Sequence, residues 1–303
     1  MTAPRQVIPG TTYLVTRRCS QRQFLLRPSE LTNQIFLYVL ALASARFGVL
    51  VHAFCVLSNH FHLVVTDPDA RLPAFGQYLD SLVARAMNIE LGRCESFWSP
   101  QSYSAVALLD PLAVVDKAAY TLANPVAAGL VRRGRDWPGL WSSPEQIGSK
   151  LRVSRPPRFF RAKGMPDEAV LELTAPPSFL DSAEFVRQLS HCLDVHEGRA
   201  ILAATAAGRE FLGAEQVLRQ SPTQRPVDRE APRSLNPRLA SMDKWKRLEA
   251  LNRLKEFSAA YRSAWSRFRT GVRDVVFPSG TYWMRVAFRV RCAGADEAMM
   301  PTG

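Results

Sequence analysis

Residues 58–65 read SNHFHLVV, a short apolar run in which two histidines flank a single phenylalanine. Successive side chains of a β-strand point to opposite faces, so His60 and His62 share one face while Phe61 and Leu63 take the other. Two imidazoles side by side on a rigid strand form half of a divalent-metal site. Histidine pairs on strands also occur as ordinary hydrogen-bonded residues, so the pair suggests phosphodiester chemistry without establishing it.

The composition predicts a basic, globular chain. Of its 303 residues 47% are hydrophobic, enough to bury a sizeable core, and 39 lysines and arginines against 27 acids give a net charge of +12. Such a charge favours a polyanionic partner, most often nucleic acid. A basic surface also serves solubility or membrane attraction, and arginine enrichment can reflect a GC-rich genome.

Cysteine usage and hydropathy indicate the compartment. The five cysteines are far apart and include no CxxC pair, which argues against a disulfide framework or a zinc–cysteine cluster. The most apolar region, residues 35–57, contains Arg46 and His52 and changes period midway, so it predicts a buried helix followed by a strand instead of a membrane span. With no signal pattern at the N-terminus, we expect a cytoplasmic, nucleoid-associated protein without a membrane partner, as a monomer or homodimer.

The first half of the chain alternates between strand and helix patterns. Strands are predicted at the start of residues 11–26, at 49–57, from the histidine pair onward and within 97–108, and helices at 31–47, 72–91 and 111–123. Ser29 is the expected N-cap of the first helix, and Asn124-Pro125 is expected to break the third. The order predicts an α+β fold, a ferredoxin-like split βαβ domain with an antiparallel sheet over residues 1–145.

The second half, residues 146–303, is predicted to be a mainly helical extension of unknown role. Residues 138–157 have the composition of a linker. A strand at 169–174, a helix at 182–193, a proline-rich loop at 219–236 and a closing strand at 281–290 accompany a basic helix at about 242–270. We interpret the apolar stripe of that helix as core and not as a base-stacking platform.

A metal held by two histidines can polarise a phosphate oxygen while a nucleophile attacks phosphorus. A tyrosine nucleophile forms a covalent phosphotyrosine, which conserves the bond energy for religation. Such a tyrosine should lie on a helix that packs over the sheet, and Tyr120 near the end of the third predicted helix meets this requirement. A tyrosine on an amphipathic helix is otherwise usually a core or rim residue.

Three motifs follow one another in the order of a known family. They are SNHFHLVV at residues 58–65, Trp98 with Tyr103, and YTLANPVAAGLV at residues 120–131. Together they closely resemble the REP-associated tyrosine transposases, which are single-tyrosine HUH transposases, so called for a histidine, a bulky apolar residue and a histidine. The resemblance covers about the first 145 residues and implies an HUH fold acting on single-stranded, hairpin-forming DNA.

The resemblance implies a role for each of four residues. His60 and His62 would bind Mg²⁺ or Mn²⁺, and Tyr120 would form a 5′-phosphotyrosine link to the DNA. Asn124, one helical turn later, would complete the metal shell. Because a residue before proline is biased out of the helix, Asn124 can instead cap a new helix beginning at Pro125. Mg²⁺ prefers oxygen ligands, so Mn²⁺ suits a two-histidine site better.

Other residues compete for these roles or for supporting ones. Tyr103 is the rival nucleophile, less favoured because no NPV turn follows it. Asp67 and Glu95 could assist as supporting carboxylates. His52 is interpreted as structural, and His196 as unrelated to the site.

Four arginines are assigned to nucleic-acid contacts: Arg17, Arg18, Arg132 and Arg133. The last two could replace an arginine that relatives often carry in the NPV turn, where this chain has Ala127. Length is a second departure from the family, because compact relatives end soon after a Trp-Pro segment, here residues 137–138. The resemblance therefore says little about the remaining half.

Three functions stay open. The first is a metal-dependent transposase that nicks and rejoins single-stranded hairpin DNA, which intact His60, His62 and Tyr120 favour. The second is a domesticated, non-cleaving DNA- or RNA-binding protein on the same fold. The third is a different metal-dependent phosphodiesterase or RNA-processing enzyme that uses water and leaves Tyr120 inert.

Overall fold

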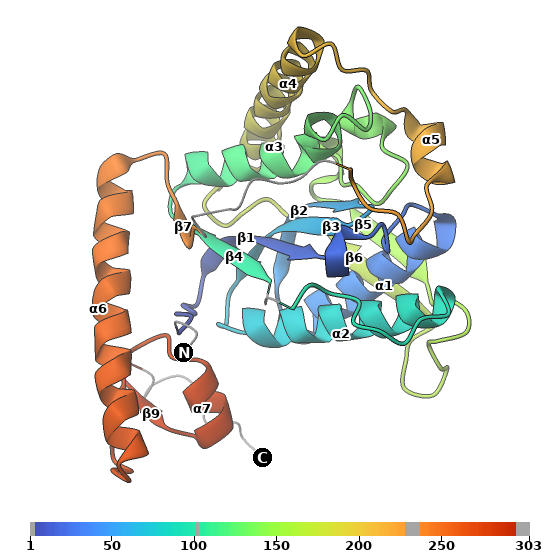
Figure 1. Ribbon diagram of the computed structural model, residues 1–303. Helices are drawn as coiled ribbons and strands as arrows, with labels where there is room; N and C mark the ends of the chain where they lie inside the picture. Colours follow the sequence, from blue (N-terminus) through green and yellow to red (C-terminus); the bar gives the residue numbers. More distant parts are fainter. Residues whose placement is uncertain (1–3, 101–102, 228–236, 295–303) are drawn as a thin grey trace.

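The computed structural model describes residues 4–100, 103–227 and 237–294, and at its centre is a five-stranded sheet (Figure 1). Its strands lie in the order β2 (Leu50–Leu57), β3 (His60–Asp67), β1 (Thr11–Arg18), β4 (Ser104–Leu108) and β7 (Leu239–Ala240). The first four pair antiparallel, and β7 adds a short parallel edge. This order, with a helix after β1 and another after β3, confirms the predicted α+β class and is that of a split βαβ domain.

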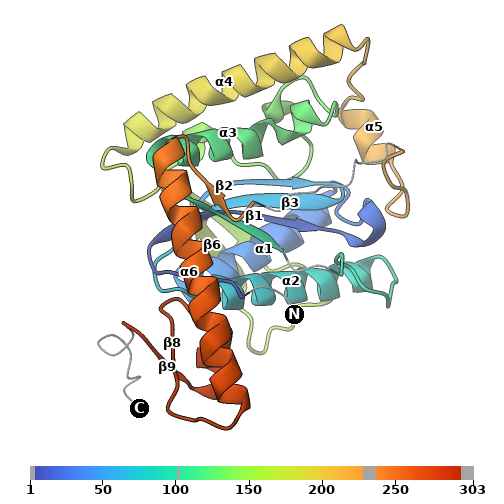
Figure 2. The ribbon, with the colours of Figure 1, turned by 60° about the vertical axis from the view of Figure 1, so that its left-hand side comes forward.

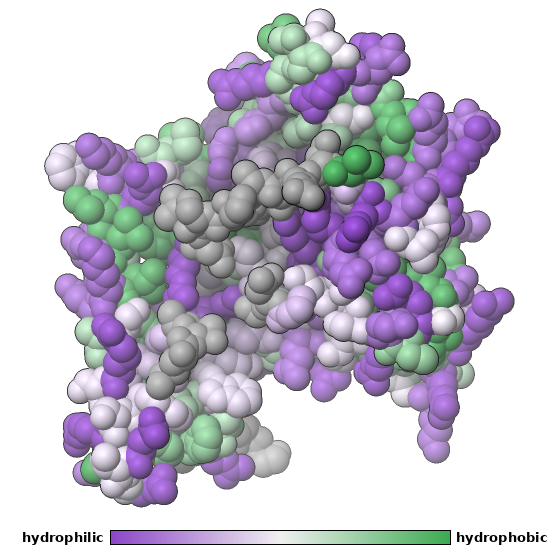
Figure 3. Space-filling view, viewed as in Figure 1, coloured by the Kyte–Doolittle hydropathy of each residue, from purple (hydrophilic) through white to green (hydrophobic). Residues whose placement is uncertain are grey.

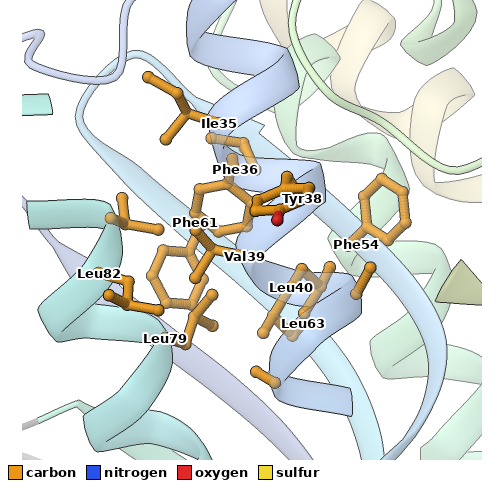
Figure 4. Close-up of a cluster of buried hydrophobic side chains, with 14 of the residues drawn as sticks. Ile35, Phe36, Tyr38, Val39, Leu40, Phe54, Phe61, Leu63, Leu79 and Leu82 are labelled. Carbon is orange, nitrogen blue, oxygen red and sulfur yellow. The ribbon is translucent and has the colours of Figure 1, made fainter. Parts of the chain in front are cut away.

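Helices α1 (Glu30–Phe47) and α2 (Leu72–Glu90) cover one face of the sheet. The Ser29 side chain accepts from the Thr32 N–H, and Gly48 ends α1 with a φ of 67°, a left-handed conformation that suits glycine. Phe61 of β3 packs edge-on against Phe36 in the core beneath these helices (Figure 4). Burial of Phe61 and Leu63 on this side fixes the register of β3, so the two histidines must face the other side.

Helix α3 (Pro111–Ala127) covers that other face, and α4 (Ser182–Ala206) packs along its outer side (Figure 2). The Asp110 side chain caps α3 by accepting from the Ala113 N–H. Phe185 and Leu189 of α4 are fully buried against α3. Helix α4 is longer than the 12 residues predicted. Tertiary packing therefore stabilises α3 and α4 more than their own helix propensities do.

Three sequence-based predictions are wrong in this region and beyond. Helix α3 continues through Asn124-Pro125, because burial of its surrounding apolar residues overrides the bias against helix before proline. Residues 138–142 are not a linker: they lie along β2, with the Val56 N–H donating to the Leu140 carbonyl and the Ser142 N–H to the Phe54 carbonyl. Where a closing strand was predicted at 281–290, the structure has helix α7 (Trp283–Phe288).

The remaining elements surround this core. Strands β5 (Lys150–Ser154) and β6 (Glu168–Glu172) form a hairpin-like pair against α1, and α5 (Ala214–Arg219) lies beyond the end of α3. The short helical turns are η1 (Ser20–Arg22), η2 (Gly134–Asp136) and η3 (Pro144–Gln146). Part of the loop predicted at 219–236 lies outside the described residues. Among the described residues, none of the helices combines the length and the apolar character needed to span a bilayer.

The basic helix α6 (Lys244–Arg269) stands beside the sheet as a long, separate rod (Figures 1 and 2). Its C-terminal part packs with α7, β8 (Val276–Phe277) and β9 (Arg291–Cys292) around buried Phe277. Its N-terminal part is different, since Trp245 is 74% exposed and Leu248 and Leu251 are also exposed. The apolar stripe is therefore core only along the second half of the helix, and Figure 3 shows apolar surface over the first half.

Candidate functional site

The two histidines lie at the start of β3 with their rings facing α3. Their ring centroids are 4.9 Å apart, and β1 places Thr16 opposite His62. The Thr16 hydroxyl lies 2.8 Å from Nδ1 of His62, and the Asn59 amide oxygen lies 2.6 Å from Nδ1 of His60. An amide oxygen can only accept, so Nδ1 of His60 donates, and Nε2 carries the lone pair of the neutral ring. Metal-binding histidines commonly hydrogen-bond their other ring nitrogen to an oxygen in this way, so the pair fits a divalent metal.

Tyr120 and Asn124 reach the same place from α3. The Tyr120 ring packs edge-on against His62 with centroids 5.5 Å apart, and the tyrosine remains 37% exposed. Asn124 is 8% exposed, and its amide nitrogen lies 3.2 Å from the Tyr120 carbonyl oxygen. Because α3 continues past it, Asn124 stays on the helix face of Tyr120 and does not cap a new helix. The structure thus brings together all four residues predicted for catalysis and metal binding.

These four residues line an open groove of about 1800 Å³ between the sheet and α3. Seven cationic residues contribute to its described lining, against a single carboxylate, that of Asp116. The cationic residues are Arg17, Arg18, Arg22, Lys117, Arg209, Arg225 and Arg247. Excess positive charge around a nucleophile and two imidazoles suits a polyanionic substrate.

The four arginines predicted to contact nucleic acid occupy different places. Arg18 is opposite His60 on the groove face of β1. Arg17 also borders the groove, but its side chain turns to the opposite face of β1, where its Nε lies 3.2 Å from the Asp80 carboxylate. At the far end of α3, Arg132 stacks over the Phe211 ring and Arg133 pairs with Glu197 at 3.2 Å, and neither lines the groove. Arg18 alone of the four has its side chain on the groove face of the fold.

The rival nucleophile and the supporting carboxylates lie elsewhere. Tyr103 packs on the α2 side beside Gly76, and burial raises the pKa of its phenol to about 12. Asp67 caps α2 by accepting from the N–H groups of Arg71 and Leu72. Glu95 is an exposed surface residue 3.8 Å from Arg93. None of these three lines the groove, so Tyr120 is the tyrosine that can meet a substrate there.

A second polar cluster joins α3 to α4 beside Tyr120. Nε2 of His196 lies 3.0 Å from the Asp116 carboxylate, whose other oxygen lies 2.9 Å from the Lys117 ammonium. The hydrogen bond from His196 lowers the pKa of Asp116 to about 2. One ligand atom each from Asp116, Cys192 and His196 lie within 4.8 Å of one another, a second set of side chains that could hold a metal.

Sequence reasoning missed this cluster and treated His196 as unrelated to the site. The contact joins residues 80 positions apart and depends on how α4 packs on α3, which no local pattern reveals. The spacing of Cys192 and His196, four residues apart on a helix, was the one available signal. Lys117, whose ammonium lies 5.8 Å from the Tyr120 ring centroid, was missed although it precedes Tyr120 by one helical turn.

No protein-family model matches this chain, and no curated protein is detectably similar to it. Among solved structures it is similar to a REP-associated tyrosine transposase bound to a REP hairpin, with 20% identity over 46% of this chain and 81% of that chain and a TM-score of 0.39. It is also similar to a proposed transposase from Deinococcus radiodurans R1, with 19% identity over 35% of this chain and 85% of that chain and a TM-score of 0.27. The first of these names gives the family that the sequence motifs resemble, and the second names a transposase without a family.

Proposed function

We propose that this protein is a metal-dependent DNA transposase that cuts and rejoins single-stranded, hairpin-forming DNA through Tyr120. The observation that carries the proposal is the meeting of His60, His62, Tyr120 and Asn124 in one cationic groove. A nucleophile, metal-binding imidazoles and phosphate-binding charge are the parts that phosphodiester transfer requires.

The proposed reaction uses these residues and takes its polarity from the family that the sequence motifs resemble. The Tyr120 phenol loses its proton and its oxygen bonds to phosphorus, while the bond from phosphorus to the 3′-oxygen breaks and that oxygen takes up a proton. The product is a 5′-phosphotyrosine, which a 3′-hydroxyl can attack in the reverse sense to rejoin DNA. Arg18 and Lys117, on the groove walls, would offset the charge of the phosphate.

His60 and His62 would hold the divalent ion through their Nε2 atoms, with the amide oxygen of Asn124 as a further ligand. Bound there, Mg²⁺ or Mn²⁺ would polarise a phosphate oxygen. Thr16 and Asn59 orient the two imidazoles toward this task. The α3–α4 cluster of Asp116, Cys192 and His196 is separate from this ligand set.

A covalent adduct tests the proposal. Labelled hairpin DNA from repeats flanking the gene is incubated with Mn²⁺ or Mg²⁺ and resolved under denaturing conditions. The wild type and Tyr103→Phe should form an SDS-resistant protein–DNA adduct, and Tyr120→Phe and His62→Ala should form none. Because both tyrosine variants remove one hydroxyl, they form a matched pair.

The other outcomes separate the alternatives. Binding without adduct or cleavage in the wild type, with both metals, would favour a non-cleaving binder that uses the same cationic groove. Cleavage that survives Tyr120→Phe would mean that water attacks phosphorus, as in a metal-dependent phosphodiesterase or RNA-processing enzyme.

A further inference from the structure

The groove that holds Tyr120 has a second wall, and that wall belongs to the C-terminal half of the chain. Arg209, Arg225 and Arg247 line the same groove as His60 and Tyr120, although they lie 89 to 127 positions after Tyr120 in the sequence. All three side chains are exposed. The contacts of this wall with the rest of the fold hold it in place, and its charges indicate what it would bind.

One end of the wall is attached beyond α3. The N–H groups of Leu212 and Gly213 donate to the carbonyls of Gly129 and Leu130, each at 2.9 Å. Val217 of α5 is fully buried in a small apolar cluster that includes residues of β2. These contacts hold Arg209 and the start of α5 next to the turn that follows Tyr120.

The other end is attached to the sheet and to the start of α3. The Ala107 N–H of β4 donates to the Arg238 carbonyl at 2.9 Å, where β7 joins the sheet. The Asp110 carboxylate, which caps α3, also accepts from the Ser241 hydroxyl at 2.5 Å and the Met242 N–H at 3.1 Å. Arg247, in the first turn of α6, is thereby fixed at the opposite end of the groove from Arg209.

Within the part of the chain that the structure describes, no carboxylate pairs with the arginines of this wall. Other surface arginines of the C-terminal half pair within their own helices, as Arg219 does with Glu215 and Arg253 with Glu249. Arg209, Arg225 and Arg247 make no ion pair with any residue that the structure describes. Asp116, the single carboxylate among the described lining residues, already contacts His196 and Lys117. Three guanidinium groups facing one open groove suit the phosphates of a DNA strand.

We propose that residues 209–227 and 237–247 form a second DNA-binding wall, whose three arginines hold the backbone of the single strand that passes Tyr120. This inference rests on the proposed function and deepens it, since it assigns the C-terminal half to substrate binding. The strand would run between the sheet and this wall, so both halves of the chain contact it.

The test measures binding separately from chemistry. A fluorescent hairpin with a single-stranded tail is titrated with full-length protein carrying Tyr120→Phe at several salt concentrations, without divalent metal. Adding Arg209→Ala, Arg225→Ala and Arg247→Ala should weaken binding about tenfold or more at low salt. Loss of three phosphate contacts should also reduce the slope of log affinity against log salt by about 2.

The matched control carries Arg253→Ala, Arg262→Ala and Arg267→Ala, three exposed arginines of α6 that do not line the groove. This control has the same net charge as the groove variant, and it should bind the hairpin as tightly as the protein that carries Tyr120→Phe alone. An equal loss of DNA affinity in both triple variants, or no loss in either, would contradict the proposed DNA-binding wall. If the wild type forms no adduct but only the groove variant loses affinity, the proposed nuclease activity is refuted. The DNA-binding wall is then still supported.

Discussion

At the residue scale, the most informative contacts are those behind the two histidines. Asn59 accepts from Nδ1 of His60 at 2.6 Å, which fixes both the tautomer and the orientation of that ring. The asparagine is thus part of the SNHFH motif for a physical reason: it presents the Nε2 lone pair of His60 to the groove.

Removing this acceptor should weaken metal binding. We expect Asn59→Ala to reduce Mn²⁺ affinity about 10- to 100-fold, the usual effect of losing the group that hydrogen-bonds a metal-binding histidine. Asn59→Asp keeps an oxygen acceptor and should retain affinity close to the wild type. Electron paramagnetic resonance of free Mn²⁺ measures both variants without relying on activity. Equal affinity in the alanine and aspartate variants would show that Asn59 does not orient the ring.

His52 should make stability depend on pH. It is buried, donates Nδ1–H to the Thr174 carbonyl at 2.8 Å, and burial lowers its pKa to about 4. The unfolded chain takes up a proton near 6.5 and the folded chain does not, so this contribution to stability is present above that value and lost as the pH falls toward 4. From about pH 7.5 to pH 5 we expect it to reduce the free energy of unfolding by about 2 kcal/mol.

Urea unfolding of the wild type and His52→Gln at both pH values isolates this contribution. Glutamine can also donate and accept but does not titrate, so the drop in stability should be smaller in the variant by about 2 kcal/mol. The comparison concerns the change with pH and holds even if the variant is less stable throughout. Parallel pH profiles would contradict a neutral, buried His52.

At the element scale, sequence patterns predicted the elements whose boundaries have local causes. Ser29 and Gly48 delimit α1 as expected, and alternation placed both histidines on the face opposite Phe61. Asn124 was ambiguous, because the bias before proline is local while the burial that keeps it helical is tertiary. The linker predicted at 138–157 was wrong for the same reason. The Trp137 indole donates to a backbone carbonyl of β2 and the Trp141 indole to one of α3, and composition cannot show such tertiary contacts.

Glu197 attaches α4 to the start of η2, in the segment that follows α3. It is 4% exposed and accepts from the Gly134 N–H at 2.6 Å and from Arg133 at 3.2 Å. Glu197→Ala leaves a buried N–H and a guanidinium without their acceptor, so we expect the free energy of unfolding to fall by about 2 kcal/mol. Glu197→Gln keeps an acceptor for Gly134 and should cost less.

Chemical denaturation followed by circular dichroism provides the measurement. Arg199→Ala, at an exposed position of the same helix, is the control and should leave the midpoint nearly unchanged. A Glu197→Ala protein as stable as this control would mean that the contacts of Glu197 with Arg133 and Gly134 add little to the stability of the fold.

At the scale of the whole molecule, the C-terminal half completes structures that begin in the first half. Leu171 and Leu173 are fully buried in the core under α1, and Phe185 and Leu189 are fully buried against α3. The sequence could not predict this, because α1 and α3, the helices that these side chains pack against, lie more than 50 positions earlier in the chain. Each segment alone looks like part of an independent extension. Packing of this kind argues that residues up to about 206 fold as one unit.

Fragments test this against the predicted domain boundary between residues 145 and 146. A fragment of residues 1–145 lacks the four buried side chains just named and exposes the apolar surfaces that they cover. We expect it to bind a hydrophobic dye and to unfold without a cooperative transition, as loosely packed states do. A fragment of residues 1–206 keeps those contacts and should unfold cooperatively in urea. Because it lacks the arginine wall of residues 209–227 and 237–247, it should also bind hairpin DNA more weakly than the full chain. If residues 1–145 unfold cooperatively with no dye binding, the boundary predicted from the sequence is right and the later packing is dispensable for folding.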